Sequence, residues 1–204
     1  VTELVTGIDL VQWQIRIASG ERLPFKQEDI VPRGWAIECR ITSEDPANGF
    51  LPSTGTISYL HVPAGPGVRW DAGIEVGSEV GLYYDPLLAK LIVHAPDRAA
   101  AIERMHRALL ELTIEGVDSS RDFQLRVMED AEFRSGAIEI QWLERRLESL
   151  TRAEPPVELT CTAAIVAALI ADRDRRAPTR PTAPAAGMPT QDAWTRVARL
   201  EGLR

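Results

Sequence analysis

Three stretches near the middle of the chain decide the fold: ECRITSEDPANGFLPSTGTI (Glu38–Ile57), GPGVRWDAGIEVG (Gly65–Gly77) and YYDPLLAKLIV (Tyr83–Val93). The first begins inside an alternating segment, WAIECRI, whose period of two predicts a β-strand. One face of that strand carries Trp35, Ile37, Cys39 and Ile41. The other carries Ala36, Glu38 and Arg40. The strand therefore presents an arginine from a rigid element with apolar backing, an arrangement suited to gripping a small planar anion or carbonyl group.

Short strands separated by turn signals extend from about Gly34 to His94. Helical patterns surround them. A first helix should open at Thr6–Asp9, capped by Thr6 or Asp9, with an apolar stripe of Ile8, Val11 and Ile15, and end at Gly20. The sequence thus predicts an α+β fold, a mostly antiparallel sheet from Trp35 to Val93 flanked by helices.

Three more helices are expected after the sheet. Asp97 should cap the first, whose stripe is Ile102, Met105, Leu109 and Leu112. The second should follow Asp118–Ser120 and carry Phe123, Leu125 and Val127. The third should extend from about Ile138 to Leu150, with Ile140, Leu143 and Leu147 on one side.

The composition changes beyond Leu150, and four parts are expected. They are a main domain over 1–150, a helical extension over 151–176, a Pro/Ala-rich linker over 177–191 and the start of a following segment over 192–204. The extension includes the alanine-rich TAAIVAALIADRDRR.

Composition restricts the possible functions. Lys and Arg total 23 against 30 Asp and Glu, a net charge of −7, which argues against a nucleic-acid partner. Cys39 and Cys161 match no metal or redox spacing, and buried apolar thiols in a reducing, cytoplasmic compartment explain them more simply. No apolar run approaches the ~20 residues that a membrane span needs. The scattered His61, His94 and His106 indicate no metal site.

The three central stretches, together with VTELVTGIDLVQWQIRIASGERL at Val1–Leu23, resemble the C-terminal domain of biotin carboxylases. The resemblance covers roughly Val1–Leu147. It implies part of an ATP-grasp ligase that carboxylates biotin from bicarbonate. The family's general-base glutamate and bicarbonate-binding arginine would lie just before Val1, and its nucleotide-binding domains further upstream. We therefore interpret the chain as part of a longer polypeptide, inactive alone, with ATP and Mg²⁺ bound mainly by the upstream domains.

The resemblance also implies roles for particular residues. Arg40 matches the arginine that contacts the ureido oxygen of biotin, and Asp85 matches a carboxylate near that site. Arg69 matches a position at the subunit interface, where Pro66 replaces a family aromatic residue. Each has a plainer alternative. Arg40 could pair with Glu38 or Asp45, Asp85 could cap a turn, and Arg69 could be an exposed arginine stacked on Trp70.

The implied partners are an upstream ATP-grasp domain, a biotin carboxyl carrier domain, a carboxyltransferase subunit and a second copy of the parent chain. A free carboxylase subunit and a fused α-subunit of an acyl-CoA carboxylase both remain open, as do acetyl-, propionyl- and methylcrotonyl-CoA as final acceptors. The contrasting hypothesis is a non-catalytic packing and oligomerisation module whose polar strand face only pairs charges internally.

Overall fold

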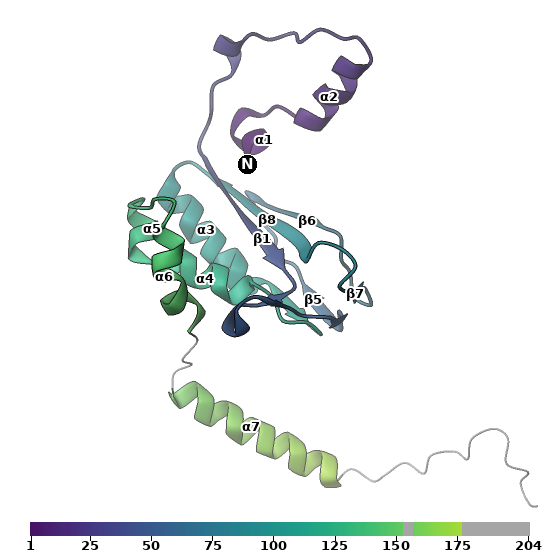
Figure 1. Cartoon of the computed structure of the whole chain (residues 1–204), viewed down its shortest axis with the longest axis vertical. Helices are drawn as coiled ribbons and strands as arrows, with labels where there is room; N and C mark the ends of the chain where they lie inside the picture. The colour runs from purple at the N-terminus through teal and green to yellow at the C-terminus, as the bar shows by residue number, and fades with distance from the viewer. Residues whose placement is uncertain (153–156, 177–204) are drawn as a thin grey trace, which may run out of the picture. The chain divides into compact units, whose positions relative to one another are not determined.

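The computed structural model describes residues 1–152 and 157–176, so the predicted linker 177–191 and the segment 192–204 lie outside it. By its internal contacts the chain divides into two compact units, Val1–Ala153 and Glu154–Arg204. The first unit holds the sheet and most of the helices (Figure 1). Among the described residues, no helix is both long and apolar enough to cross a membrane.

A three-stranded antiparallel sheet forms the centre of the first unit. Its order is β1 (Trp35–Thr42), β8 (Leu87–Ala95), β6 (Val68–Ala72). Strand β8 lies in the middle and is the most deeply buried strand, in keeping with its nearly continuous apolar sequence. The register places Cys39 opposite Leu91, and Leu91 opposite Trp70. The predicted antiparallel sheet and the α+β class are both confirmed.

Three two-stranded ladders extend this sheet. They pair β2 with β3, β4 with β7, and β5 with β9, all antiparallel. The strands are β2 (Glu44–Asp45), β3 (Leu51–Pro52), β4 (Gly55–Thr56), β5 (Tyr59–His61), β7 (Glu79–Val80) and β9 (Thr113–Glu115). A 3₁₀ turn, η2 (Pro46–Asn48), joins β2 to β3, with Asp45 as its cap. These pieces are short because turn residues interrupt the sequence every few positions.

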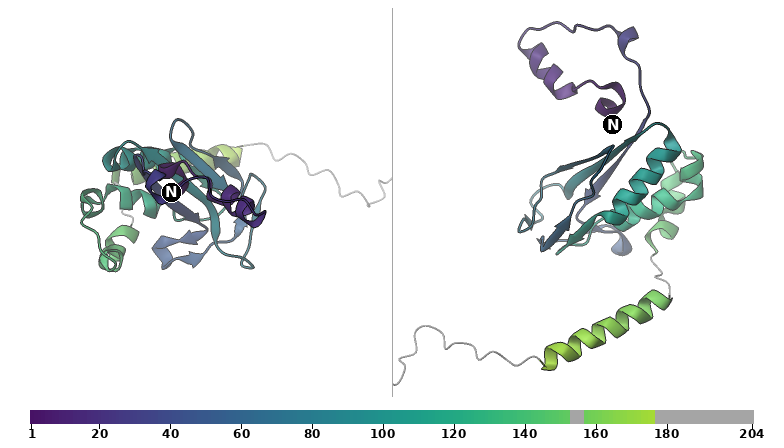
Figure 2. Two further views of the ribbon diagram at one scale, coloured as in Figure 1. Left: turned by 90° about the horizontal axis from the view of Figure 1, so that it is seen from above. Right: turned by 180° about the vertical axis from the view of Figure 1, so that it is seen from behind.

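Four helices follow the sheet and gather on one side of it (Figures 1 and 2). They are α3 (Arg98–Glu111), α4 (Arg121–Glu129), α5 (Ala131–Ser135) and α6 (Trp142–Thr151). The side chain of Asp97 caps α3 by accepting from the Ala100 N–H at 2.8 Å, as predicted. The core between helices and sheet contains the whole predicted α3 stripe: Ile102, Met105, Leu109 and Leu112, with Cys39, Ile41, Leu91, Val93, Phe123 and Val127.

The prediction for α6 is wrong in detail. Ile140 precedes the helix and is fully exposed, while Leu143 and Leu147 are 42% and 37% exposed. The buried side chains are Trp142 and Leu150 instead. The residue between them on that face is Arg146, which pairs with the buried carboxylate of Asp130. A charged residue in the middle of the buried stripe conceals its helical period in the sequence. The short helix α5 was not predicted.

The expected N-terminal helix is α2 (Leu10–Ala18), and a short helix that was not predicted, α1 (Thr2–Thr6), precedes it. Gly7 ends α1 in the left-handed region at φ 72°, and Asp9 caps α2 by accepting from the Gln12 N–H at 2.9 Å. The cap prediction at Asp9 is thus confirmed. Neither helix contains a buried residue, and Val11 and Ile15 are more than 60% exposed. A 3₁₀ turn, η1 (Gln27–Asp29), follows before β1.

In the second unit, the described part is one helix, α7 (Val157–Arg176). This confirms the helix expected from the alanine-rich sequence. Its larger apolar side chains are exposed: Ile165, Val166, Leu169 and Ile170.

Candidate functional site

The sheet has one apolar face and one polar face, and the polar face contains the predicted site. Strand register sets two rows of side chains there. One row runs Glu38–Ile92–Arg69 and the next runs Arg40–Lys90–Asp71, across β1, β8 and β6. The helices α3 and α4 pack on the opposite, apolar face. Five of the six residues in these two rows are charged, and they project from the central sheet of the domain.

Arg40 lies on β1, and its side chain is 69% exposed. Its nearest carboxylate oxygen is Oε1 of Glu38, 3.9 Å from Nε, which is too long for a hydrogen bond. The alternative partner, Asp45, instead accepts from the N–H of Ala47 at 2.9 Å and from the Asn48 amide. The guanidinium therefore keeps most of its donors available, although its backbone is firmly held.

That backbone is held by Ser120 at the start of α4. The Ser120 hydroxyl donates to the carbonyl of Arg40 at 3.2 Å and accepts from the N–H of Thr42 at 3.0 Å. Ser120 is itself buried. The strand thus fixes where the Arg40 side chain begins, while the side chain beyond it is left to solvent.

Asp85 caps the loop that enters β8. Its Oδ1 accepts from the N–H of Leu87 at 2.8 Å, which is the turn geometry expected of an aspartate before proline. Within the described residues its carboxylate makes no ion pair with an arginine. The capping alternative is seen directly; the role near biotin stays a prediction.

Arg69 is held by two carboxylates of its own chain. Its Nε donates to both oxygens of Asp71 at 2.9 and 3.0 Å, and its Nη1 lies 3.1 Å from Oε1 of Glu3 on α1. The hydrogen bonds that the guanidinium donates to Asp71 and Glu3 raise the pKa of Arg69. Trp70 points to the apolar face and packs against the core, so the stacking alternative is wrong. Pro66 is exposed in the turn before β6, and its interface role stays a prediction.

A cavity of about 240 Å³ lies between this polar face and the two N-terminal helices. Its lining combines Glu38, Arg69, Asp71, Lys90 and Ile92 from the sheet with Glu3, Leu4, Leu10 and Val11 from α1 and α2. Lys90 makes no ion pair within 4.0 Å to any described residue. A second cavity, of about 280 Å³, lies near η2 and the start of α4 and contains none of the predicted site residues.

No pattern in the sequence indicates Glu3, which reaches the polar face from α1. Asp71 could have been suspected, because it follows Arg69 by two positions and so shares its strand face.

The three histidines each have a different partner and do not form a cluster with one another. His61 contacts the carbonyl of Glu111 and His94 that of Arg33, both at 2.8 Å, and His106 pairs with Glu129 at 3.0 Å. No cluster of metal ligands occurs among the described residues.

These features define an antiparallel α+β domain with an arginine-bearing polar sheet face. Residues 38–145 match the family described as the biotin carboxylase C-terminal domain. The 2-oxoglutarate carboxylase small subunit of Hydrogenobacter thermophilus is 47% identical over 154 residues, which are 76% of this chain and 33% of the relative. A biotin carboxylase of Haemophilus influenzae is 46% identical over 147 residues, 72% of this chain and 33% of the relative.

Solved structures agree. The biotin carboxylase domain dimer of Hydrogenobacter thermophilus 2-oxoglutarate carboxylase, in complex with MgADP, ADP and bicarbonate, superimposes with a TM-score of 0.73 at 47% identity. The match covers 76% of this chain and 34% of that one. The chain therefore belongs to the biotin carboxylase C-terminal domain family. It spans about a third of the length of the curated relatives it matches.

Proposed function

We propose that this chain is the C-terminal part of an ATP-dependent biotin carboxylase, which carboxylates biotin on a carrier domain from bicarbonate. In this role the chain supplies part of the biotin site and subunit contacts. The observation that carries the proposal is the Arg40 guanidinium, presented by a rigid strand with no carboxylate of a described residue closer than 3.9 Å. It stands in a domain whose relatives include enzymes named biotin carboxylase.

The chemistry gives such an arginine a specific use. Carboxylation requires the ureido nitrogen of biotin to lose a proton, and negative charge then builds on the ureido oxygen. Arg40 would donate hydrogen bonds to that oxygen without reorganising, because β1 and Ser120 already hold its backbone. A lysine would bring the charge without the planar donor geometry.

The family resemblance implies that ATP and Mg²⁺ are bound mainly by domains upstream of this chain. We propose that the chain alone releases no ADP from ATP, and the assay for that is ADP release from ATP and bicarbonate by the purified chain. The related domain named above is described with MgADP and bicarbonate bound, which agrees with a site completed by the rest of that protein.

The partners follow from the same proposal: an upstream ATP-grasp domain, a biotin carboxyl carrier domain, a carboxyltransferase subunit and a second copy of the parent. Relatives named 2-oxoglutarate carboxylase and methylcrotonoyl-CoA carboxylase subunit alpha extend the candidate acceptors to a 2-oxo acid besides acyl-CoA thioesters. Free and fused subunits both remain open. We keep the cytoplasm as the proposed compartment, since Cys39 and Cys161 are both free thiols.

The test is Arg40→Ala in the full-length parent protein. Biotin-dependent ATP turnover should fall by about 10²–10³-fold, the usual effect of removing one donor to a developing oxyanion. The matched control is Arg107→Ala. Arg107 lies on α3, which packs on the apolar face of the sheet. Its side chain is 47% exposed, and its guanidinium pairs with Glu111 at 2.8 Å. Unchanged turnover in Arg40→Ala would favour the non-catalytic packing module instead.

A further inference from the structure

Residues 1–34 form an arm that the core does not hold. None of its residues is buried, although α1 and α2 make up much of its length. Figure 1 shows this arm leaving the sheet and returning to it at β1. Fully buried apolar side chains therefore do not fix the position of this arm relative to the sheet.

The helix α1 is well ordered within itself. The Thr6 hydroxyl donates to the carbonyl of Thr2 at 2.7 Å, and Gly7 closes the helix by donating to the carbonyl of Glu3 at 2.8 Å. Helix α1 lies close to β1, and two polar contacts join it to the rest of the domain. The N–H of Arg33 donates to the carbonyl of Val5 at 2.7 Å, and Glu3 reaches Arg69 on β6. The first contact is made by the coil just before β1, and the second is the ion pair that α1 makes with the sheet.

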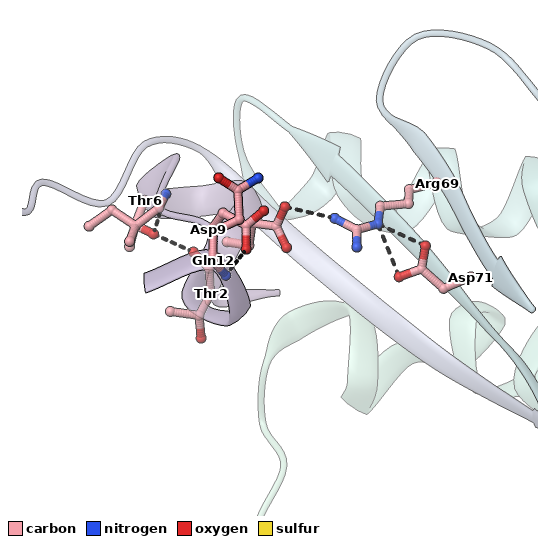
Figure 3. Close-up of polar contacts among 8 residues, drawn as sticks. Thr2, Thr6, Asp9, Gln12, Arg69 and Asp71 are labelled. Atoms are coloured by element: carbon pink, nitrogen blue, oxygen red, sulfur yellow. Dashed lines mark hydrogen bonds and ion pairs between the residues drawn. The ribbon is translucent and has the colours of Figure 1, made fainter. Parts of the chain in front are cut away.

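Figure 3 shows the guanidinium of Arg69 between two carboxylates, with Asp71 on one side and α1 on the other. Both carboxylate oxygens of Asp71 accept from Arg69 Nε, and this contact sets the orientation of the guanidinium plane. With Nε committed to the sheet, Nη1 is directed at Glu3. The planar guanidinium thus contacts β6 through Nε and α1 through Nη1 in one fixed geometry. A lysine ammonium would carry the charge without this geometry.

We propose that Arg69 is a positioning residue that ties α1 to the polar sheet face and so sets the chain just before Val1 relative to Arg40. This inference rests on the proposed function, in which residues preceding Val1 carry the general base and Arg40 holds the ureido oxygen. Asp71, which orients Arg69, lies in the same cross-strand row as Arg40, separated by Lys90. The ion pair between Arg69 and Glu3 would therefore join the part of the site before Val1 to the part that contains Arg40.

The test uses the full-length parent with Arg69→Gln, Glu3→Gln and the double variant, and Arg107→Gln as control. A half-exposed ion pair is worth little, so each single variant should lower biotin-dependent turnover only about two- to fivefold. Because both remove the same tie, the double variant should be no slower than either single one. The KM for biotin should rise while the KM for ATP stays unchanged. Arg69→Lys should fall between wild type and Arg69→Gln.

Amide hydrogen exchange provides a second readout. Amides of residues 4–7 should exchange faster in Arg69→Gln and Glu3→Gln, while those of β1 and β8 keep their protection. Three results would overturn the proposal: unchanged α1 exchange, additive losses in the double variant, or a change in the dimer equilibrium of Arg69→Gln that Glu3→Gln does not share. The last would assign Arg69 to the subunit interface. Failure of the proposed function would be distinct, because Arg40→Ala would then also leave turnover unchanged.

Discussion

The two faces of the central sheet use the same three strands for opposite purposes. On the apolar face, Cys39, Leu91 and Ile41 are at most 2% exposed and join one core with the helices. On the polar face, Arg40 is 69% exposed and Lys90 has no ion pair to any described residue. The comparison teaches that one face packs into the core and stabilises the fold, while the other presents charged side chains outside that core.

The largest expected difference between the two faces comes from changing adjacent residues of β8 that point to opposite sides of the sheet. Leu91→Ala removes a fully buried side chain from the middle strand, and the free energy of unfolding should fall by about 2–5 kcal/mol. Lys90→Ala, the matched control, should change it by less than about 0.5 kcal/mol. Urea denaturation of the purified chain measures both. Equal losses would show that the polar face also supports the fold.

The two cysteines sharpen the comparison chemically. Burial, with a smaller effect from the charge of Glu38, raises the pKa of Cys39 to about 12. Cys161 on α7 is exposed, so the prediction that both thiols are buried is wrong for Cys161. At pH 8 a thiol reagent should therefore modify Cys161 rapidly and Cys39 about a thousandfold more slowly. Since the folded pKa is raised, this thiol adds stability that is complete below the unfolded pKa, about 8.5, and is lost as pH rises toward 12. Rapid modification of both thiols in the folded chain would contradict the buried assignment.

A carboxylate that serves the fold provides a contrast to the polar face. The Asp130 side chain is 2% exposed, caps α5 and accepts from Arg146 Nη2 at 2.5 Å. Burial disfavours its charge, but the hydrogen bonds from Arg146, Phe133 and Glu132 outweigh that effect and lower the pKa of Asp130. Its stabilisation is therefore present above the unfolded pKa, about 3.9, and is lost as pH falls below it.

Asp130→Asn should accordingly destabilise the chain by roughly 1–3 kcal/mol at pH 7 and by less at pH 3. Thermal unfolding across that pH range measures the difference. Glu44→Gln is a suitable control, since Glu44 lies on β2 and makes no ion pair to a described residue. A constant loss at every pH would mean that the charge of Asp130 does not contribute.

The sequence predicted those parts of the fold where one face repeats without interruption. The alternation of β1 and the stripe of α3 are regular, and Asp9 and Asp97 have the side chains that helix caps require. It failed at α6, where Arg146 interrupts the buried stripe, and at the N-terminal arm, where an apolar pattern is present but not buried.

The candidate site was predicted for a different reason. Arg40 stands out because a charged residue alternates with apolar ones on a single strand, and the family resemblance gave it a partner. Glu3 could not be found this way, because its contact with Arg69 spans 66 residues and depends on how the arm returns to the sheet. Long-range ion pairs leave no periodic signal in a sequence.

The most direct test of the central claim is Arg40→Lys in the full-length parent, measured for both biotin-dependent turnover and thermal midpoint. The variant keeps the positive charge but loses the planar donors. We predict that turnover falls at least tenfold while the thermal midpoint is unchanged. Wild-type turnover, or an equal loss of turnover and stability, would contradict the assignment of this face to catalysis.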